Sequence, residues 1–373
     1  MLPFIDHIPS IGGQLALYAA LFVAGIVLLE KGADKLVDSL AIVAKRFGVS
    51  QTTIALLTAG AEWEELAVVT VALAQGHRDL GLGNIVGSCI ANVIGSFSLG
   101  LLFPGDRVLE VDRSARLYTA LLGVVTLVVG ALAWTNHLSK PLGAGLMLVF
   151  AAYVAVVGYA IYRGVMEPPV DSDSDSESDS GLSSSSDDEE GLNSGPNGVS
   201  RVETSSTPLV NGIIPGIGLR RPKSTAYHVA TVGVSFIALS VSGYLLAGSS
   251  TAFAEAAGLT DTVVGLTLLS FATTLPEKLV AVMAARRGQS GILLANTVGA
   301  NIMLLTLVLG IVLCTGDVRL SDKTRMYDLS VLMGSSAAFI VVIYTGYLRK
   351  WVGGLLLVGY VAYIVGNFVI KDV

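Results

Sequence analysis

The amino-acid sequence predicts an all-α, polytopic membrane protein of about ten transmembrane helices, arranged as two inverted five-helix repeats. Three observations lead to this fold class. Of the 373 residues, 53% are hydrophobic and only 14% are charged, which exceeds the apolar content of an ordinary soluble domain. Runs of about 20 apolar residues, the length that crosses a hydrocarbon core, follow one another along the chain. An unusual acidic stretch in the first half also has a counterpart in the second half.

The apolar runs place five predicted spans on each side of a polar segment. They cover residues 14–30, 49–74, 83–103, 117–134, 141–162, 226–248, 261–285, 291–314, 327–346 and 350–369. The first run has no basic segment or small-residue cleavage pattern before it, so we expect a retained span and not a removed signal peptide. The predicted domains are a first membrane repeat over 1–165, a polar loop over 166–224 and a second membrane repeat over 225–373.

The polar loop carries the net charge of the protein. Residues 171–224 contain ten acidic and four basic residues, a difference equal to the formal net charge of −6 for the whole chain. Acids alternate with serines there and few residues are apolar, which predicts disorder. The loop is either a solvated linker or a regulatory tether that senses cations or is phosphorylated by a kinase. The remainder is neutral, and nothing in it indicates a nucleic-acid partner.

The distribution of Lys and Arg predicts the orientation in the lipid bilayer. Loops on one side of the predicted spans carry sixteen of these residues, and loops on the other side carry six. Because Lys and Arg accumulate on the cytoplasmic side, we expect the N-terminus to be outside or lumenal and the long loop to be cytosolic.

The most informative stretch is TAGAEWEEL, residues 58–66, which places Glu62, Glu64 and Glu65 inside a predicted span. A charged side chain at the centre of a membrane helix costs roughly 2.5 kcal/mol or more, so intramembrane acids usually face a cavity and serve as ion or proton sites. The counterpart of this stretch is SFATTLPEK, residues 270–278, which contains Glu277.

A constant offset of 212 residues relates the two halves. It maps Glu65 to Glu277 and Asn84 to Asn296, so each half has an acid in one helix and an amide 19 residues later in the next. Five spans per half is an odd number, so the two halves enter the membrane from opposite sides. Inverted repeats of this kind, with helices broken by Gly or Pro near a midplane site, are typical of secondary transporters. The predicted breaks are at Gly60 and Pro276.

At these residues the chain resembles the calcium/cation antiporter superfamily, and in particular its sodium/calcium exchangers. Members of that family carry two inverted repeats that read approximately G-T-S-x-P-E and then G-N-x-x-G-S-N. The resemblance covers both five-helix halves and leaves out the acidic loop, and it extends to GADKLV at residues 32–37. It implies a transporter that exchanges calcium for sodium or protons, and it implies no cofactor.

The resemblance also implies a set of cation ligands. These are one acid from each half, two amides and two flanking hydroxyls, namely Glu65, Glu277, Asn84, Asn296, Thr273 and Thr274. Calcium takes six to eight oxygen ligands, and backbone carbonyls freed at the two helix breaks add to this set. Sodium accepts the same hard oxygens, so competition for shared carboxylates is a physical basis for exchange.

Two residues depart from the family pattern. Glu62 stands where the pattern has a hydroxyl residue, and it lies three residues before Glu65 on roughly the same helix face. Two acids so close repel each other when both are ionised, which favours a further cation ligand or a proton carrier over a solvated vestibule acid. Lys278 directly follows Glu277. It is either a snorkelling or paired lysine or a tethered ammonium that replaces one bound cation.

We therefore expect secondary active exchange of calcium for sodium by alternating access. A proton-coupled calcium/cation exchanger is the alternative that the additional glutamates favour. A transport-inactive membrane scaffold or a cation channel is a further alternative, although a channel is expected to use rings of carbonyls or charges. The sequence contains no nucleophile paired with a base, no metal cluster and no nucleotide-binding loop, so we do not expect an enzyme.

Overall fold

The computed structural model of the chain describes residues 11–46, 62–104, 109, 111, 113–163, 224–316, 318 and 320–370. Within these ranges the chain forms helices and π-helical turns and no strands, which confirms the predicted all-α class. Three predicted features lie outside the described residues. They are the acidic loop, the break at Gly60 and the part of the second span before residue 62.

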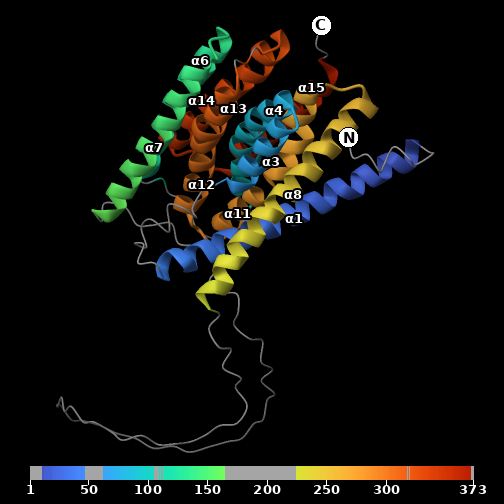
Figure 1. Cartoon of the computed structure of the whole chain (residues 1–373). Helices are drawn as coiled ribbons and strands as arrows, with labels where there is room; N and C mark the ends of the chain where they lie inside the picture. Colours follow the sequence, from blue (N-terminus) through green and yellow to red (C-terminus); the bar gives the residue numbers. More distant parts are fainter. Residues whose placement is uncertain are drawn as a thin grey trace, which may run out of the picture. The chain divides into compact units, whose positions relative to one another are not determined.

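The helices of the two halves follow one another in the same order (Figure 1). The first half contains α1 (Ile11–Arg46), α3 (Trp63–Ala74), α4 (Arg78–Ile90), η1 (Ala91–Ser96), α5 (Phe97–Leu102), α6 (Arg113–Trp134) and α7 (Lys140–Tyr162). The second half contains α8 (Thr225–Ala257), α9 (Asp261–Val264), η2 (Gly265–Leu269), α10 (Ser270–Thr273), α11 (Leu275–Arg286), α12 (Ser290–Met303), η3 (Leu304–Val308), α13 (Leu309–Thr315), η4 (Thr324–Asp328), α14 (Leu329–Thr345) and α15 (Lys350–Val369). The η elements are π-helical turns.

Most of the predicted spans are present as long apolar helices. Among the described residues, eight helices are long and apolar enough to cross a membrane, or nine when a bent pair counts as one span. That pair joins Asp261–Thr273 to Leu275–Arg286 with a bend of 46°. The predicted span over 49–74 is described only from residue 62, as α3.

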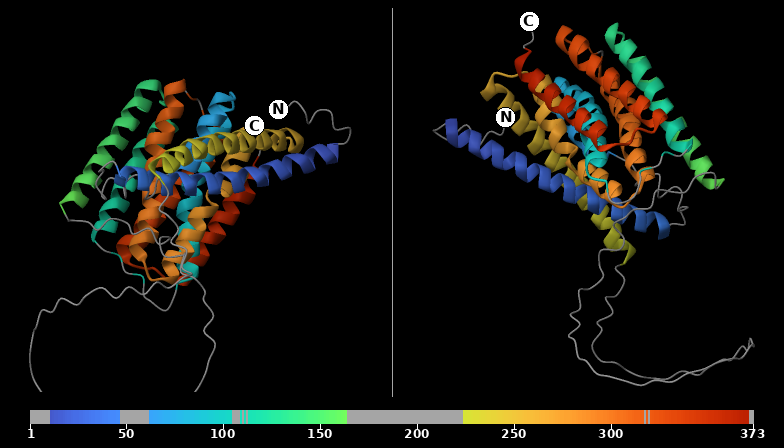
Figure 2. Two further views of the ribbon diagram at one scale, coloured as in Figure 1. Left: turned by 60° about the horizontal axis from the view of Figure 1, so that its bottom comes forward. Right: turned by 180° about the vertical axis from the view of Figure 1, so that it is seen from behind.

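Helix packing relates the two halves to each other. Helix α1 lies beside α8, its counterpart in the second half, and α6 packs on its counterpart α14 (Figures 1 and 2). A further contact is repeated with the halves interchanged. Helix α7 packs on α13, and their counterparts in the other half, α15 and α5, pack on each other. These pairings are the ones expected when two equivalent five-helix units are related by a pseudo-twofold axis. They agree with the predicted inverted repeat.

Two apolar clusters fill the spaces between these helices. The larger cluster contains residues of both halves, including Phe97 of α5 and Phe339 of α14, whose rings meet edge to face with centroids 4.8 Å apart. The smaller cluster joins α1, α3 and α8 to the bent pair, through residues such as Leu36, Val68 and Leu246. The elements that carry the predicted site, α3, α4 and the bent pair, contribute residues to both clusters.

Glycines bring α4 unusually close to the bent pair. A Cβ atom added at Gly83 would lie 2.5 Å from the carbonyl oxygen of Thr262, and one added at Gly265 would overlap the carbonyl oxygen of Leu80. Small residues at such crossings allow helix backbones to approach each other within a membrane. This close crossing places Asn84, one residue after Gly83, directly against the helix break of the second half.

Candidate cation-binding site

Three glutamate side chains from the two halves converge in the interior. Carboxylate oxygens of Glu62, Glu65 and Glu277 all lie within 4.8 Å of one another. The exposed fractions of these residues are 4%, 0% and 9%. We call this group the acid triad. It joins the two predicted acids to Glu62, the residue that departs from the family pattern.

The acid triad is positioned by the beginnings of two short helices. Glu62 is the N-cap of α3 and Glu65 lies in the first turn of that helix, while Glu277 lies in the first turn of α11 just after Pro276. Proline is well tolerated at the first turn of a helix, where its missing N–H has no partner to lose. The partial positive charge at a helix N-terminus favours carboxylates there. Both halves therefore present acids from the same local structure.

Four of the six carboxylate oxygens of the triad have no hydrogen-bond partner among the described residues. Within the described part of the chain, both oxygens of Glu65 and one oxygen each of Glu62 and Glu277 are buried without a hydrogen-bond partner. Burying unpaired ionised groups costs several kcal/mol per ion unless an opposite charge or hydrogen bonds compensate it. Carboxylate oxygens are the ligands that hard cations such as Ca²⁺ prefer. The triad is therefore suited to hold a cation.

Polar residues connect the triad to the helix break. The hydroxyl of Thr273 is shared between the carbonyl oxygen of Leu269 in its own helix, at 3.1 Å, and Oδ1 of Asn84, at 3.4 Å, and both Thr273 and Asn84 are buried. The next residue, Thr274, separates α10 from α11, and its hydroxyl donates to the carbonyl oxygen of Ser270 at 2.6 Å. The structure thus brings Asn84, Thr273 and Thr274 together at the break that precedes Glu277.

Asn296, the predicted counterpart of Asn84 in the second half, is less buried than Asn84. It is only partly buried on α12, and we retain its role as a prediction. A second amide of α12, Asn301, is buried and donates from Nδ2 to the carbonyl oxygen of Cys89 at 3.1 Å. Its Oδ1 accepts a hydrogen bond from Nδ2 of Asn92 at 3.3 Å. Asn92 and Asn301 thus form an amide pair between the equivalent helices of the two halves.

The amide pair was not among the predicted ligands, although the sequence carried a signal for it. The family motif G-S-N ends at position 301 in the second half, where Asn301 matches it, and at position 89 in the first half, where Cys89 does not. Asn92 lies in η1, and η3 begins at the equivalent place in the second half. Such π-helical turns are frequent at functional sites.

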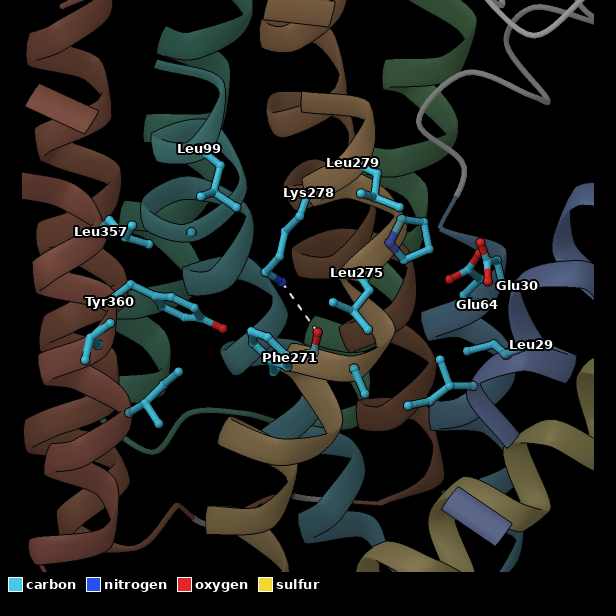
Figure 3. Close-up of a pocket in the computed structure, with 16 residues that line it drawn as sticks. Leu29, Glu30, Glu64, Leu99, Phe271, Leu275, Lys278, Leu279, Leu357 and Tyr360 are labelled. Carbon is cyan, nitrogen blue, oxygen red and sulfur yellow. Dashed lines mark hydrogen bonds between the residues drawn. The ribbon is translucent and has the colours of Figure 1, made fainter. Parts of the chain in front are cut away.

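A cavity of about 560 Å³ lies beside the break. Its polar lining residues are Glu30 of α1, Glu64 of α3, Lys278 of α11 and Tyr360 of α15 (Figure 3). Glu30 and Glu64 lie next to each other at one side of the cavity in this view, and Lys278 and Tyr360 lie at the other. Glu64, one of the three acids that the sequence places inside a predicted span, is only partly buried and lines this cavity outside the triad.

The sequence matches a known family over most of its length. The family described as "Sodium/calcium exchanger protein" matches residues 17–159 and 227–369. The chain is 29% identical over 350 residues to the sodium/calcium exchanger MaX1 of Methanosarcina acetivorans, covering 93% of this chain and 97% of that protein. It is 25% identical over 352 residues to human sodium/potassium/calcium exchanger 5, covering 78% of this chain and 68% of the human protein. These matches confirm the resemblance found in the sequence.

Solved structures show the same fold. The chain superposes on the sodium-calcium exchanger NCX_Mj, soaked with sodium and without calcium, with a TM-score of 0.57 and 19% sequence identity. The superposition covers 96% of this chain and 100% of that one. The same exchanger soaked with sodium and strontium gives a TM-score of 0.57 at 20% identity, covering 94% and 98% of the two chains. The predicted helical architecture is confirmed at the level of the fold.

Proposed function

The chain belongs to the sodium/calcium exchanger protein family, and we propose that it exchanges calcium for sodium across a membrane by alternating access. The observation that carries this proposal is the acid triad, in which buried carboxylates of both repeats lie within 4.8 Å of one another. Glu62 and Glu65 come from the first repeat and Glu277 from the second. A site shared between two equivalent units changes its exposure when one unit moves relative to the other.

The ligand chemistry supports calcium as one of the two transported ions. Ca²⁺ takes six to eight oxygens at 2.3–2.6 Å, from carboxylates, carbonyls, amides and water. We propose that the triad supplies the charged ligands and that Asn84, Thr273 and Thr274 supply neutral oxygens near the break. Asn296 keeps the same proposed role on the opposite repeat. Sodium binds the same kinds of oxygen, so occupation by one ion excludes the other.

The orientation follows from the distribution of basic residues. With sixteen Lys and Arg residues in the loops of one side and six in those of the other, we propose that the N-terminus is outside or lumenal and that the long acidic loop is cytosolic. A kinase acting on the serines of that loop would add negative charge to it. The loop then serves regulation and not the transport step.

Proton coupling is the second candidate, and Glu62 is the observation that favours it. Glu62 is buried within the triad and has one unpaired carboxylate oxygen among the described residues. Three carboxylates this close cannot all stay ionised at low cost unless a cation binds. A proton on one of them would serve as the counter-ion when calcium leaves.

The experiment uses the full chain reconstituted in liposomes. Calcium flux is measured first with a sodium gradient at equal pH on both sides, and then with a pH gradient in the absence of sodium. We expect the sodium gradient to drive calcium flux and the pH gradient to drive little. Flux with the pH gradient alone would establish the second candidate. The absence of flux under both gradients, in protein whose folding is verified by its melting temperature, would contradict an exchanger function.

A further inference from the structure

Lys278 is a buried lysine beside the acid triad, and its contacts are unusual for a membrane lysine. Its exposed fraction is 6%. The Nζ atom donates hydrogen bonds to the carbonyl oxygens of Thr274 at 3.1 Å and Phe271 at 3.5 Å. It also donates to the hydroxyl oxygen of Thr274. Figure 3 shows the ammonium reaching back across the break between α10 and α11 toward Phe271.

These contacts rule out a snorkelling lysine. A snorkelling side chain covers apolar surface with its stem and places its charge in the polar interface. The Lys278 ammonium instead lies 4.8 Å from the ring centroid of Phe271 and 6.0 Å from that of Tyr360, on the wall of the cavity beside the break. An ammonium over an aromatic face is attracted by the ring quadrupole, more strongly when it is desolvated.

The same contacts rule out a simple salt bridge. Among the described residues, no carboxylate oxygen lies within 4.0 Å of the Lys278 ammonium. Its partners are two backbone carbonyls and a hydroxyl, which the helix break makes available. Neutral oxygens of this kind are what a protein offers to a monovalent cation stripped of its water. The ammonium therefore occupies the kind of environment that a bound alkali ion would require.

The Lys278 ammonium changes the net charge that transported cations must neutralise. The carboxylates of Glu277, Glu65 and Glu62 are near enough to act electrostatically on the Lys278 ammonium. Three negative charges and one positive charge leave two negative charges. One Ca²⁺ or two Na⁺ neutralise them equally. This count covers the acid triad and the ammonium. Glu64 also interacts electrostatically with Glu277 and Glu65, but it is partly buried, lies at the far side of the cavity near Glu30 and is not counted.

We propose that Lys278 is a covalently tethered cation of the transport site, which takes the place of one monovalent ion at the α10–α11 break and sets the exchange at two Na⁺ for one Ca²⁺. The exchange is then electroneutral, because the ammonium stays with the protein in both halves of the cycle. This inference rests on the proposed sodium/calcium exchange and specifies its stoichiometry. Without the ammonium, the site carries three negative charges, and a third sodium ion is needed to balance them when calcium is absent.

The test measures charge movement per calcium ion. Full-length protein is reconstituted in liposomes under a fixed sodium gradient, and the membrane potential is set with a potassium gradient and an ionophore. We expect calcium accumulation by the wild type to be independent of the potential. In Lys278→Met, we expect a potential change of about 60 mV to alter steady-state accumulation about tenfold, the effect of one elementary charge. The sodium dependence of flux should steepen from about two to about three ions per calcium.

Two control variants separate charge from structure. Lys278→Arg keeps the positive charge, and we expect it to retain potential-independent exchange even where its rate is lower. Lys350→Met makes the same substitution at an exposed lysine at the start of α15, and we expect it to behave as the wild type. A purely structural role of Lys278 would lower the flux of Lys278→Met without changing the charge moved per calcium.

The outcomes are distinct. Potential-dependent calcium accumulation in the wild type would overturn this inference but leave the proposed exchange function standing. This measurement tests the inference even if Lys278→Met does not fold. Potential-independent exchange by a folded Lys278→Met protein would overturn it as well. The absence of sodium-driven calcium flux in the wild type would overturn the proposed function and this inference with it.

Discussion

Thr273 of the second repeat donates a hydrogen bond to the amide oxygen of Asn84 in the first repeat, at a distance of 3.4 Å between the two oxygens. Both residues are fully enclosed, and Thr273 lies four residues before Glu277. The hydrogen bond holds the helix break of one repeat against the glycine-rich helix α4 of the other. The shape of the site therefore depends on a contact between the two repeats.

Removal of this hydroxyl should weaken calcium binding without removing a charge. Thr273→Val keeps the side-chain volume but leaves Asn84 without its partner, which costs about 1–3 kcal/mol for a buried amide. We expect the apparent affinity for calcium to fall by roughly tenfold, measured from the calcium dependence of flux in liposomes. Thr297→Val is the control, because the Thr297 hydroxyl donates within its own helix to the carbonyl of Leu293 at 3.1 Å. Equal affinities in the two variants would contradict a role for the Asn84 contact.

Glu65 and Glu277 should each be indispensable. Replacing either by Gln removes one of the charged oxygen ligands, and an amide cannot neutralise a divalent cation. We expect Glu65→Gln and Glu277→Gln to lower calcium flux at least about tenfold while leaving the melting temperature of the purified protein close to that of the wild type. Glu255→Gln, at an exposed position of α8, serves as the matched control. Wild-type flux in either variant would remove the two-acid site from consideration.

Much of this architecture could be predicted because hydropathy and internal repetition are properties of the residue order alone. Ten apolar runs and one constant offset are enough to predict two equivalent five-helix halves, and an acid within an apolar run is evident without a structure. The choice of amides was harder, because it depends on which helix face packs inward. In the first repeat Asn84, Ser88 and Asn92 are buried at intervals of four residues, whereas in α12 the buried polar residues are Thr297 and Asn301.

Equivalent positions of the two helices are not all buried alike. Asn84 is enclosed whereas Asn296 is only partly buried, although Ala300 and Leu304, which correspond to Ser88 and Asn92, are both buried. Tertiary packing sets this difference, and a linear comparison of the two halves does not contain it. The contacts of Lys278 were inaccessible for the same reason, because they depend on the 46° bend between the two helices.

The close crossing of α4 with the bent pair should be sensitive to a single methyl group. Gly83→Ala would place a Cβ atom 2.5 Å from the carbonyl oxygen of Thr262 and 3.0 Å from the amide nitrogen of Leu266. Both are backbone atoms, so the helices must separate. Overpacking of this kind costs about 1–3 kcal/mol, and we expect a lower melting temperature in detergent together with reduced flux.

A second glycine substitution controls for the change in helix propensity. Gly233→Ala lies in α8, where an added Cβ atom would meet nothing within 4 Å. We expect its melting temperature and flux to match or exceed those of the wild type. A Gly83→Ala protein as stable and as active as Gly233→Ala would show that the crossing tolerates a wider separation.

The acidic loop should be dispensable for transport. Its alternating acids and serines contribute no apolar surface to the membrane domain, and both matched family segments, 17–159 and 227–369, lie outside it. We expect a deletion of residues 171–200 to retain sodium-driven calcium flux and to change its regulation by phosphorylation or by cytosolic cations. Complete loss of flux in a folded deletion variant would make the loop part of the transport machinery.

The last prediction concerns Glu62, which decides between sodium coupling alone and a contribution from protons. Protons and calcium compete for the carboxylates of the triad, so the affinity for calcium must weaken as the pH falls and the carboxylates become protonated. The more carboxylates take part, the more protons each calcium ion displaces. By linkage, the slope of the logarithm of affinity against pH equals the number of protons released on binding.

Glu62→Ser restores the hydroxyl of the family pattern and removes one carboxylate from the triad, while Glu65 and Glu277 remain. We expect this variant to transport calcium with a flatter pH dependence of its affinity between about pH 5.5 and 8, by up to about one proton per calcium ion. Both proteins are measured in parallel in liposomes under the same sodium gradient. Glu255→Ser is the matched control, because Glu255 is exposed on α8, away from the triad. If the Glu62→Ser curve coincided with those of the wild type and Glu255→Ser, Glu62 would not exchange protons with calcium, and proton coupling would lose its structural basis.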